Sequence, residues 1–123
     1  GYEGEELSDV EATVEHVKAC RPDVFLTTVA YPIKGTPYYD EVAPRLVSPR
    51  GWRDTTDREL KIRGRHARPY YQFADQLLRS EVALDRVRSS RDGAESSPEA
   101  VQLRGQIDAA RRGLQESFRE VEA

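Results

Sequence analysis

The fold is decided by the stretch GYEGEELSDVEATVEHVKACRPDVFLTTVAYPIKGTP, residues 1–37. It opens on a loop with two glycines and continues into a segment whose valines recur every three or four residues. This spacing places Val10, Val14 and Val17 on one face of a helix that runs to about Cys20.

Both ends of this helix carry sequence signals. Ser8 and Glu11 have the S-x-x-E spacing of a capping box, in which each side chain bonds the backbone amide of the other residue. Pro22 disfavours helical geometry at Arg21, so we expect the helix to end there.

The next segment, VFLTTVAY at 24–31, is rich in β-branched and aromatic residues and shows no polar alternation. Such a run is typical of a strand covered on both faces in a parallel sheet. A lone strand would leave its amides and carbonyls unpaired, which is costly when they are buried. We therefore expect the neighbouring strands to precede Gly1. The chain is then interpreted as the C-terminal part of a larger protein, and its glycine loop as an internal turn.

A second helix start follows the strand. Thr36 can cap a short helix that runs to about Ala43, and Pro37 suits its first position. Residues 1–47 are therefore interpreted as the last βα units of an α/β fold, and residues 48–66 as a polar connector.

The remaining sequence predicts two helices, at 67–91 and 98–123, joined by a linker at 92–97. Ser97 can cap the second helix, with Pro98 at its first position. Each helix carries an apolar seam, and we expect the two to pack as an antiparallel hairpin. The seams are Tyr70, Ala74, Leu77, Leu84 and Val87, and Ala100, Leu103, Ile107, Ala110, Leu114, Phe118 and Val121.

The composition argues against several classes of protein. A net charge of −3 argues against a general nucleic-acid-binding surface, which needs a positive excess. The single cysteine, Cys20, excludes an internal disulfide and a multi-cysteine metal site, and we expect it to be buried or half-buried. No run of about 18 apolar residues predicts a membrane span, so we expect a cytoplasmic protein.

Together these motifs resemble the last third of a radical S-adenosylmethionine enzyme. In that family a glycine/glutamate loop and a helix follow the fifth strand, and a P-x-x-GTP-x-Y segment ends the sixth. The stretch 64–88 resembles the helical tail of the subgroup that often carries a cobalamin-binding domain. The matching residues are Gly1, Gly4 and Glu5 in the loop, Thr13 in the helix, and Pro32, Gly35, Thr36, Pro37 and Tyr39 at the strand exit.

The resemblance implies the end of a partial (β/α) barrel, with about one strand here, followed by a mostly helical extension. Enzymes of this family bind a [4Fe–4S] cluster through a C-x-x-x-C-x-x-C loop and cleave S-adenosylmethionine to a 5′-deoxyadenosyl radical; some also use cobalamin. The cysteine loop is not in this chain, so we expect the chain alone to be inactive, with no catalytic residue and no metal ligand of its own. It would supply part of the pocket wall for an unidentified small-molecule substrate, with the upstream part of the same polypeptide as its partner.

The resemblance also implies roles for six residues. Gly1 and Gly4 would let the backbone approach the adenosine of the cofactor, or would form a plain turn. Glu5 would be a polar contact to the cofactor, or a charge at the helix start.

Tyr31, Lys34 and Thr36 follow the strand, at the face that carries active sites in barrels, and are the substrate-binding candidates. Lys34 would contact an anionic group or be a solvated loop residue, and Thr36 would bind substrate or only cap its helix.

Two histidines are weaker candidates. His16 falls on the helix side away from the valines, so we expect it to be exposed. His66 lies in RGRHAR, which is interpreted as a solvated charge cluster, or alternatively as a basic loop that contacts a phosphate or other domains of the parent protein.

Two other functions stay open. The helical hairpin could be an interaction module that self-associates or binds another protein. Alternatively, the chain could be the tail of a different α/β enzyme without an iron–sulfur cluster, because a βα turn followed by GTP is not unique to one family.

Overall fold

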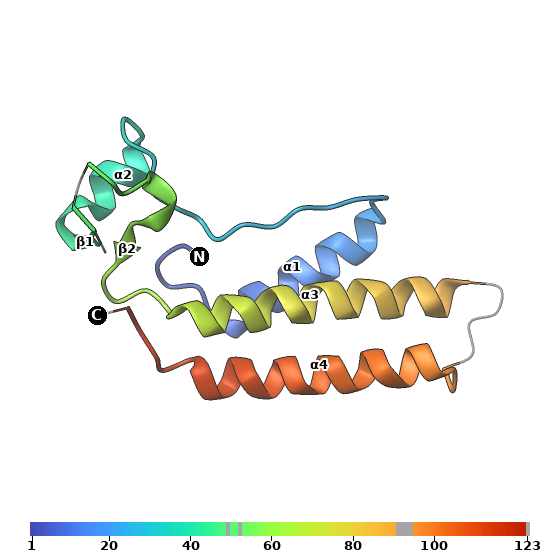
Figure 1. The fold of residues 1–123 in the computed structure, drawn as a ribbon. Helices are drawn as coiled ribbons and strands as arrows, with labels where there is room; N and C mark the ends of the chain where they lie inside the picture. The colour runs from blue at the N-terminus through green and yellow to red at the C-terminus, as the bar shows by residue number, and fades with distance from the viewer. Residues whose placement is uncertain (49, 52, 91–94, 123) are drawn as a thin grey trace.

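The computed structural model describes residues 1–48, 50–51, 53–90 and 95–122, and over these residues the chain is mostly helical (Figure 1). Its helices are α1 (Leu7–Cys20), α2 (Pro37–Val42), α3 (Arg68–Ser89) and α4 (Pro98–Ser117), with short 3-10 helices η1 (Ala43–Arg45) and η2 (Asp57–Glu59). Strands β1 (Leu46–Val47) and β2 (Lys61–Ile62) form a small antiparallel sheet, with Leu46 opposite Ile62.

Helices α3 and α4 form the antiparallel hairpin that their apolar seams predict (Figure 1). Leu77 and Leu114 are almost completely buried in the core that the two helices share. The Gln76 side-chain amide donates to the Gln106 carbonyl at 3.3 Å, which helps to fix the register. Residues 92–94 of the predicted linker lie outside the described residues.

The apolar seam predicted for the last helix extends beyond the end of that helix in the structure. Helix α4 ends at Ser117, so Phe118 and Val121 are 41% and 53% exposed. After Ser117 the chain turns back, and Val121 pairs with His66 in an isolated antiparallel bridge. The prediction of one helix over 98–123 is therefore wrong in its last residues, because backbone pairing with the connector replaces the last helical turn.

Two predicted helix caps are confirmed. The Thr36 hydroxyl accepts from the Tyr39 amide at 3.3 Å, and the Ser97 hydroxyl accepts from the Ala100 amide at 3.2 Å. In both helices a proline follows the cap, where its missing amide costs nothing.

The predicted cap of α1 is wrong by two residues. Helix α1 begins at Leu7, and the Glu6 amide donates to the Asp9 carboxylate at 2.7 Å. Glu11 does not turn back to Ser8, because its carboxylate is paired with Arg111 of α4. A local cap formed by Glu6 and Asp9 has replaced the predicted one, and Glu11 takes part in a tertiary ion pair instead.

Helix α1 packs against α3 and completes a three-helix core. Val10 and Val14 are buried in that core, as their spacing predicts. At the other end Arg21 adopts a left-handed conformation, with φ of 46°, and donates its amide to the Val17 carbonyl at 3.1 Å. The helix therefore ends where Pro22 requires.

A network of charged side chains joins the three helices. Glu81 of α3 pairs with Lys18 of α1 at 2.8 Å and with Arg111 of α4 at 3.0 Å, and Arg111 also pairs with Glu11. Burial by itself would raise the pKa of Glu81, but the bonds from Lys18 and Arg111 outweigh it and hold this pKa below its ordinary value.

Segment 24–31 corrects the predicted fold class. The segment runs extended along the helices (Figure 1), but within the described chain no backbone–backbone hydrogen bond joins it to another segment. The end of a barrel is therefore not formed by these residues, because a strand needs a hydrogen-bonded neighbour. The segment is also covered on one face only: Phe25 packs against the core, whereas Val24 and Leu26 are 79% and 90% exposed.

We predict opposite effects for two glycine substitutions in α4. A Cβ on Gly113 would overlap the ring of Phe73, whereas a Cβ on Gly105 would meet open space. Gly113→Ala should lower the free energy of unfolding by about 1–3 kcal/mol through overpacking. Gly105→Ala should raise it by up to about 1 kcal/mol through helix propensity. Chemical denaturation measures both, and equal effects would contradict the close approach of α3 and α4.

We predict that Glu81 makes the fold sensitive to acid. Because its pKa is lowered by folding, its contribution is complete above the pKa of the unfolded chain and is lost as the pH falls through the folded value. Glu81→Gln should flatten the acid side of the stability profile below about pH 4.5. Glu15→Gln is the control, because the Glu15 side chain is 69% exposed and pairs with the same Lys18 at the surface. If the free energy of unfolding falls equally steeply with decreasing pH in wild type and in Glu81→Gln, this role of Glu81 is excluded.

Candidate functional site

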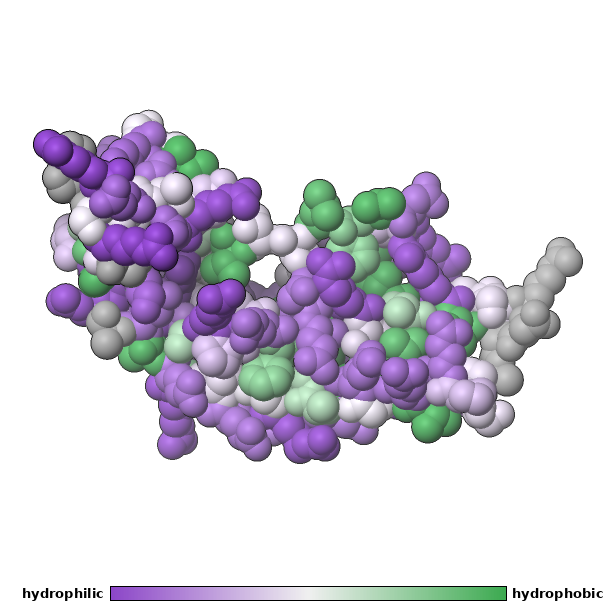
Figure 2. All heavy atoms as spheres, in the orientation of Figure 1, coloured by the Kyte–Doolittle hydropathy of each residue, from purple (hydrophilic) through white to green (hydrophobic). Residues whose placement is uncertain are grey.

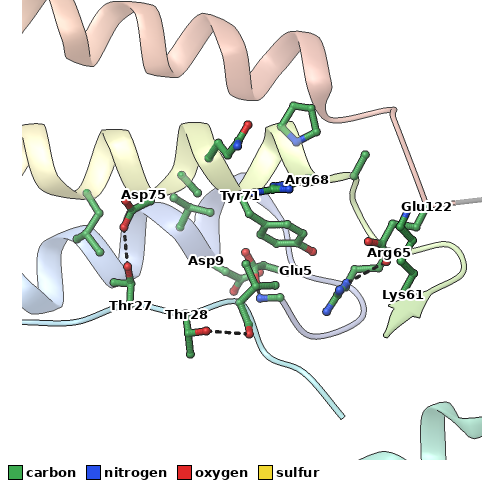
Figure 3. A pocket seen from close by; sticks show the side chains of 18 of the residues that line it. Glu5, Asp9, Thr27, Thr28, Lys61, Arg65, Arg68, Tyr71, Asp75 and Glu122 are labelled. Atoms are coloured by element: carbon green, nitrogen blue, oxygen red, sulfur yellow. Dashed lines mark hydrogen bonds and ion pairs between the residues drawn. The ribbon is translucent and has the colours of Figure 1, made fainter. Parts of the chain in front are cut away.

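A cavity of about 1110 Å³ lies between segment 24–31, the helices α1 and α3, and the C-terminal residues. Figure 2 shows a hollow between the part of the molecule around α2 and the helical part, and Figure 3 shows the side chains that line the cavity. The lining residues used below are Gly1, Glu5, Asp9, Thr27, Thr28, Val29, Lys61, Arg65, Tyr71, Asp75 and Glu122.

The acidic wall of the cavity comes from the start of α1. Gly4 has a positive φ of 79°, which turns the chain into the helix and favours glycine there. Glu5 and Asp9 then line the cavity beside Tyr71 of α3 (Figure 3). Two carboxylates near a helix N-terminus disfavour an anion there and suit hydroxyls or a cationic group on a ligand.

The opposite wall is centred on Arg65, which precedes α3. Its guanidinium donates to the Ala30 carbonyl at 2.6 Å and lies 5.7 Å from the centre of the Tyr71 ring. Its Nε is 3.4 Å from the Glu122 carboxylate. Arg65 therefore connects the exit of the extended segment to α3 and to the C-terminal residues.

Thr27 ties the middle of the extended segment to the cavity wall. Its hydroxyl donates to Asp75 of α3 at 2.5 Å, and Arg79 donates to the other oxygen of Asp75 at 2.8 Å. Burial by itself would raise the pKa of Asp75, but these two bonds hold it below its ordinary value. Asp75 is therefore a structural carboxylate that stays ionised.

Several buried polar atoms near this wall have no hydrogen-bond partner among the residues that the structure describes. They are the hydroxyls of Tyr70 and Tyr71, Nδ1 of His66 and Nε of Arg65. Burial raises the pKa of Tyr70 to about 12 and raises that of Tyr71 further, so both phenols stay protonated. Most buried polar groups in proteins are paired, so these four atoms set this part of the wall apart from the rest of the described chain.

The structure separates the predicted cofactor residues from the predicted substrate residues. Gly1 and Glu5 line the main cavity, and the Glu5 carboxylate accepts from the Gly1 nitrogen. Gly4 lines a smaller neighbouring cavity of about 260 Å³.

The three predicted substrate residues do not line the main cavity. Thr36 caps α2, and Lys34 is exposed, with its amide donating to Asp57 at 3.2 Å. The Arg58 guanidinium lies over the Tyr31 ring, with 5.2 Å between its Cζ atom and the centre of the ring.

Of the other candidates, one is confirmed and two are wrong. His16 is exposed, as predicted. Cys20 is exposed rather than buried, because it lies on the solvent side of the last turn of α1. His66 is half-buried rather than solvated. Its ring stacks on the Tyr70 ring, with 4.0 Å between the ring centres, and its Nε2 lies 3.1 Å from the Glu5 carbonyl oxygen.

Sequence reasoning missed Arg65, Tyr71 and Glu122 as cavity residues. The stretch 64–71 did carry a signal, because two basic residues, a histidine and two tyrosines stand together around the start of a helix. No local pattern connects this stretch to Glu122, which lies more than fifty residues further along the chain.

Compared with known proteins, the chain matches no family model, no curated protein and no solved structure. Among the described residues, none of the helices has the length and apolar character needed to cross a membrane. In the same part of the chain, no group of three or more histidine, cysteine or acidic side chains could hold a metal ion.

We predict that Tyr70→Phe stabilises the protein. The Tyr70 hydroxyl is buried without a partner, and such a group costs about 1 kcal/mol or more. The free energy of unfolding should rise by about 1 kcal/mol. Tyr39→Phe is the control, since the Tyr39 hydroxyl is not among the buried unpaired atoms, and it should change little. A loss of stability in Tyr70→Phe alone would mean that its hydroxyl has a partner in solution.

Proposed function

We propose that this chain is the C-terminal part of a radical S-adenosylmethionine enzyme and forms part of the wall of its cofactor and substrate pocket. The observation that carries the proposal is the position of Gly1. A Cβ on Gly1 would lie 2.7 Å from Cγ1 of Val29 and 3.0 Å from the amide nitrogen of Ala30. The glycine loop therefore lies against the C-terminal end of the extended segment.

This contact supports the proposal because a βαβ unit would produce it. In such a unit the first strand ends beside the C-terminal end of the second, because the two strands are parallel and the helix returns the chain. Helix α1 carries the chain away from Gly1, and segment 24–31 brings it back (Figure 1). A strand that precedes Gly1 would lie beside this segment in parallel orientation.

The exposed surfaces of segment 24–31 also support a larger sheet. Its backbone has no ladder partner within the described chain, and Leu26 is 90% exposed. Backbone edges and apolar faces of this kind are normally paired and covered. Strands upstream in the same polypeptide would satisfy both requirements.

The cavity is lined by Thr27, Thr28 and Val29, in the middle of the segment and next to the end at which barrel enzymes place their active sites. Glu5 and Gly1 line it, and their chemistry suits the hydroxyls and the amino group of S-adenosylmethionine. When bound to a reduced cluster, this cofactor supplies a 5′-deoxyadenosyl radical. The residues of this chain would bind and orient the cofactor, whereas the cluster ligands would lie upstream, since Cys20 is exposed and is the single cysteine.

The alternative of a helical interaction module has less support. The apolar residues of α4 are largely buried against α3, so little of the seam is left for a partner. The most exposed apolar residues lie instead on the extended segment, at Val24 and Leu26. This distribution favours a sheet partner over self-association of the hairpin.

The test uses the parent polypeptide, which we expect to contain a C-x-x-x-C-x-x-C loop upstream of Gly1. After anaerobic reconstitution it should bind an iron–sulfur cluster and release 5′-deoxyadenosine from S-adenosylmethionine. Glu5→Gln should raise the KM for this cofactor roughly tenfold, because a charge-assisted hydrogen bond is lost.

Glu3→Gln is the matched control. The Glu3 side chain is 66% exposed and pairs with Arg45 outside the main cavity, so its loss should leave the KM unchanged. A parent without the cysteine loop, or one that releases no 5′-deoxyadenosine, would refute the proposed function. If the two substitutions change the KM equally, the role of Glu5 is refuted, but the proposed function is not.

A further inference from the structure

The carboxylate of Glu122 lies where two donors converge. The Ile62 amide donates to its Oε2 at 2.8 Å, and Arg65 Nε approaches the same oxygen to 3.4 Å. Backbone bonds hold Glu122 in this position. Its amide donates to the Arg65 carbonyl at 2.8 Å, and its carbonyl accepts from the Gly64 amide at 2.9 Å.

Arg65 is not fully satisfied by this arrangement. Its side chain is only 10% exposed, and within the described chain its Nε is buried without a hydrogen bond, because the 3.4 Å contact with Glu122 is not aligned as a hydrogen bond requires. The bond to the Ala30 carbonyl, at 2.6 Å, holds the guanidinium in place. A buried, fixed donor therefore faces a carboxylate that does not bond it well.

The position is open to the main cavity. Lys61, Arg65 and Glu122 all line that cavity and lie together at one end of it (Figure 3). A ligand in the cavity could reach Arg65 directly, and it could reach the buried Ile62 amide at the position that the Glu122 carboxylate now occupies.

We propose that the Ile62 amide and the Arg65 guanidinium form a carboxylate-binding subsite of the cavity, which Glu122 fills as an internal ligand. Arginine is suited to a planar carboxylate because its N–H groups match the two oxygens of that group. A carboxylate on a free ligand is not tied to the C-terminal backbone, so it can align with Nε and with the Ile62 amide together. Such a ligand would displace the Glu122 side chain and leave the bridge between Val121 and His66 intact.

This subsite is independent of the proposed enzyme family, since it uses only contacts within this chain. The ligand class it selects is a small molecule with a carboxylate group. Glu122 acts as a competitor for that ligand, so the wild-type chain should bind simple carboxylates weakly.

The test uses the full chain labelled with ¹⁵N and sodium acetate as the probe, with the Ile62 amide resonance as the readout. In Glu122→Ala, acetate should shift this resonance saturably, with an affinity roughly tenfold or more above that of wild type, because the internal competitor is gone. Glu120→Ala is the matched control. Its side chain is exposed on the same C-terminal segment, so it should respond as wild type does.

Arg65→Gln added to Glu122→Ala should abolish the acetate response. The proposal is overturned if Glu122→Ala shows no saturable shift, if Arg65→Gln leaves the shift unchanged, or if sodium chloride at the same ionic strength reproduces it. A larger response to inorganic phosphate would overturn the assignment to a carboxylate.

Hydrogen exchange of the Ala67 amide, which donates to the Glu120 carbonyl at 2.9 Å, reports whether the C-terminal segment stays attached. If Glu122→Ala detaches it, Glu122→Ser is measured in its place. No acetate response in that variant also overturns the proposal.

Discussion

Helix α3 must bury two apolar faces at once, and this requirement determines where α1 and α4 pack. One face carries Leu77 into the hairpin with α4, and the other receives Val10 and Val14 of α1. Neither partner helix contacts enough apolar surface elsewhere to be stable alone, because short helices in water depend on tertiary packing. The three helices therefore form one core, with α3 at its centre.

The charged residues between these helices determine how the helices are arranged more than they add to the net free energy of folding. Glu81 receives bonds from Lys18 and Arg111, which come from the two helices on either side of α3. A buried or half-buried ion pair offsets its own desolvation cost only when its partners are well placed. The network therefore selects the arrangement in which α1 and α4 both meet α3 at the level of Glu81.

The three-helix core also determines which side chains line the cavity. Tyr71 and Asp75 lie on α3, so the helix that organises the core also presents side chains to the cavity. The extended segment is attached to this wall at two points, Thr27 to Asp75 and Ala30 to Arg65. The segment is extended without being a sheet strand because its backbone has no hydrogen-bonded neighbour within the described chain, and its outer face is exposed at Val24 and Leu26.

The helices and two of the caps could be predicted from the sequence because their causes are local. A threonine or serine followed by proline starts a helix wherever the chain goes, and apolar spacing of three and four marks a buried face. The predicted cap of α1 is wrong because Glu6 and Asp9 cap the helix two residues earlier. Glu11 is paired instead with Arg111, a partner one hundred residues away that no local rule can anticipate.

The candidate site shows the same division between local and tertiary causes. The sequence by itself determined the glycine turn before α1 and the acidic residues that follow it, since a positive φ at Gly4 is a property of one residue. Only the tertiary structure decided that Glu122 would meet Arg65, and that Lys34 and Thr36 would lie away from the cavity. The reason is physical: a side chain's place in a site depends on where the packed helices bring its backbone, and that packing is settled by contacts between distant parts of the chain.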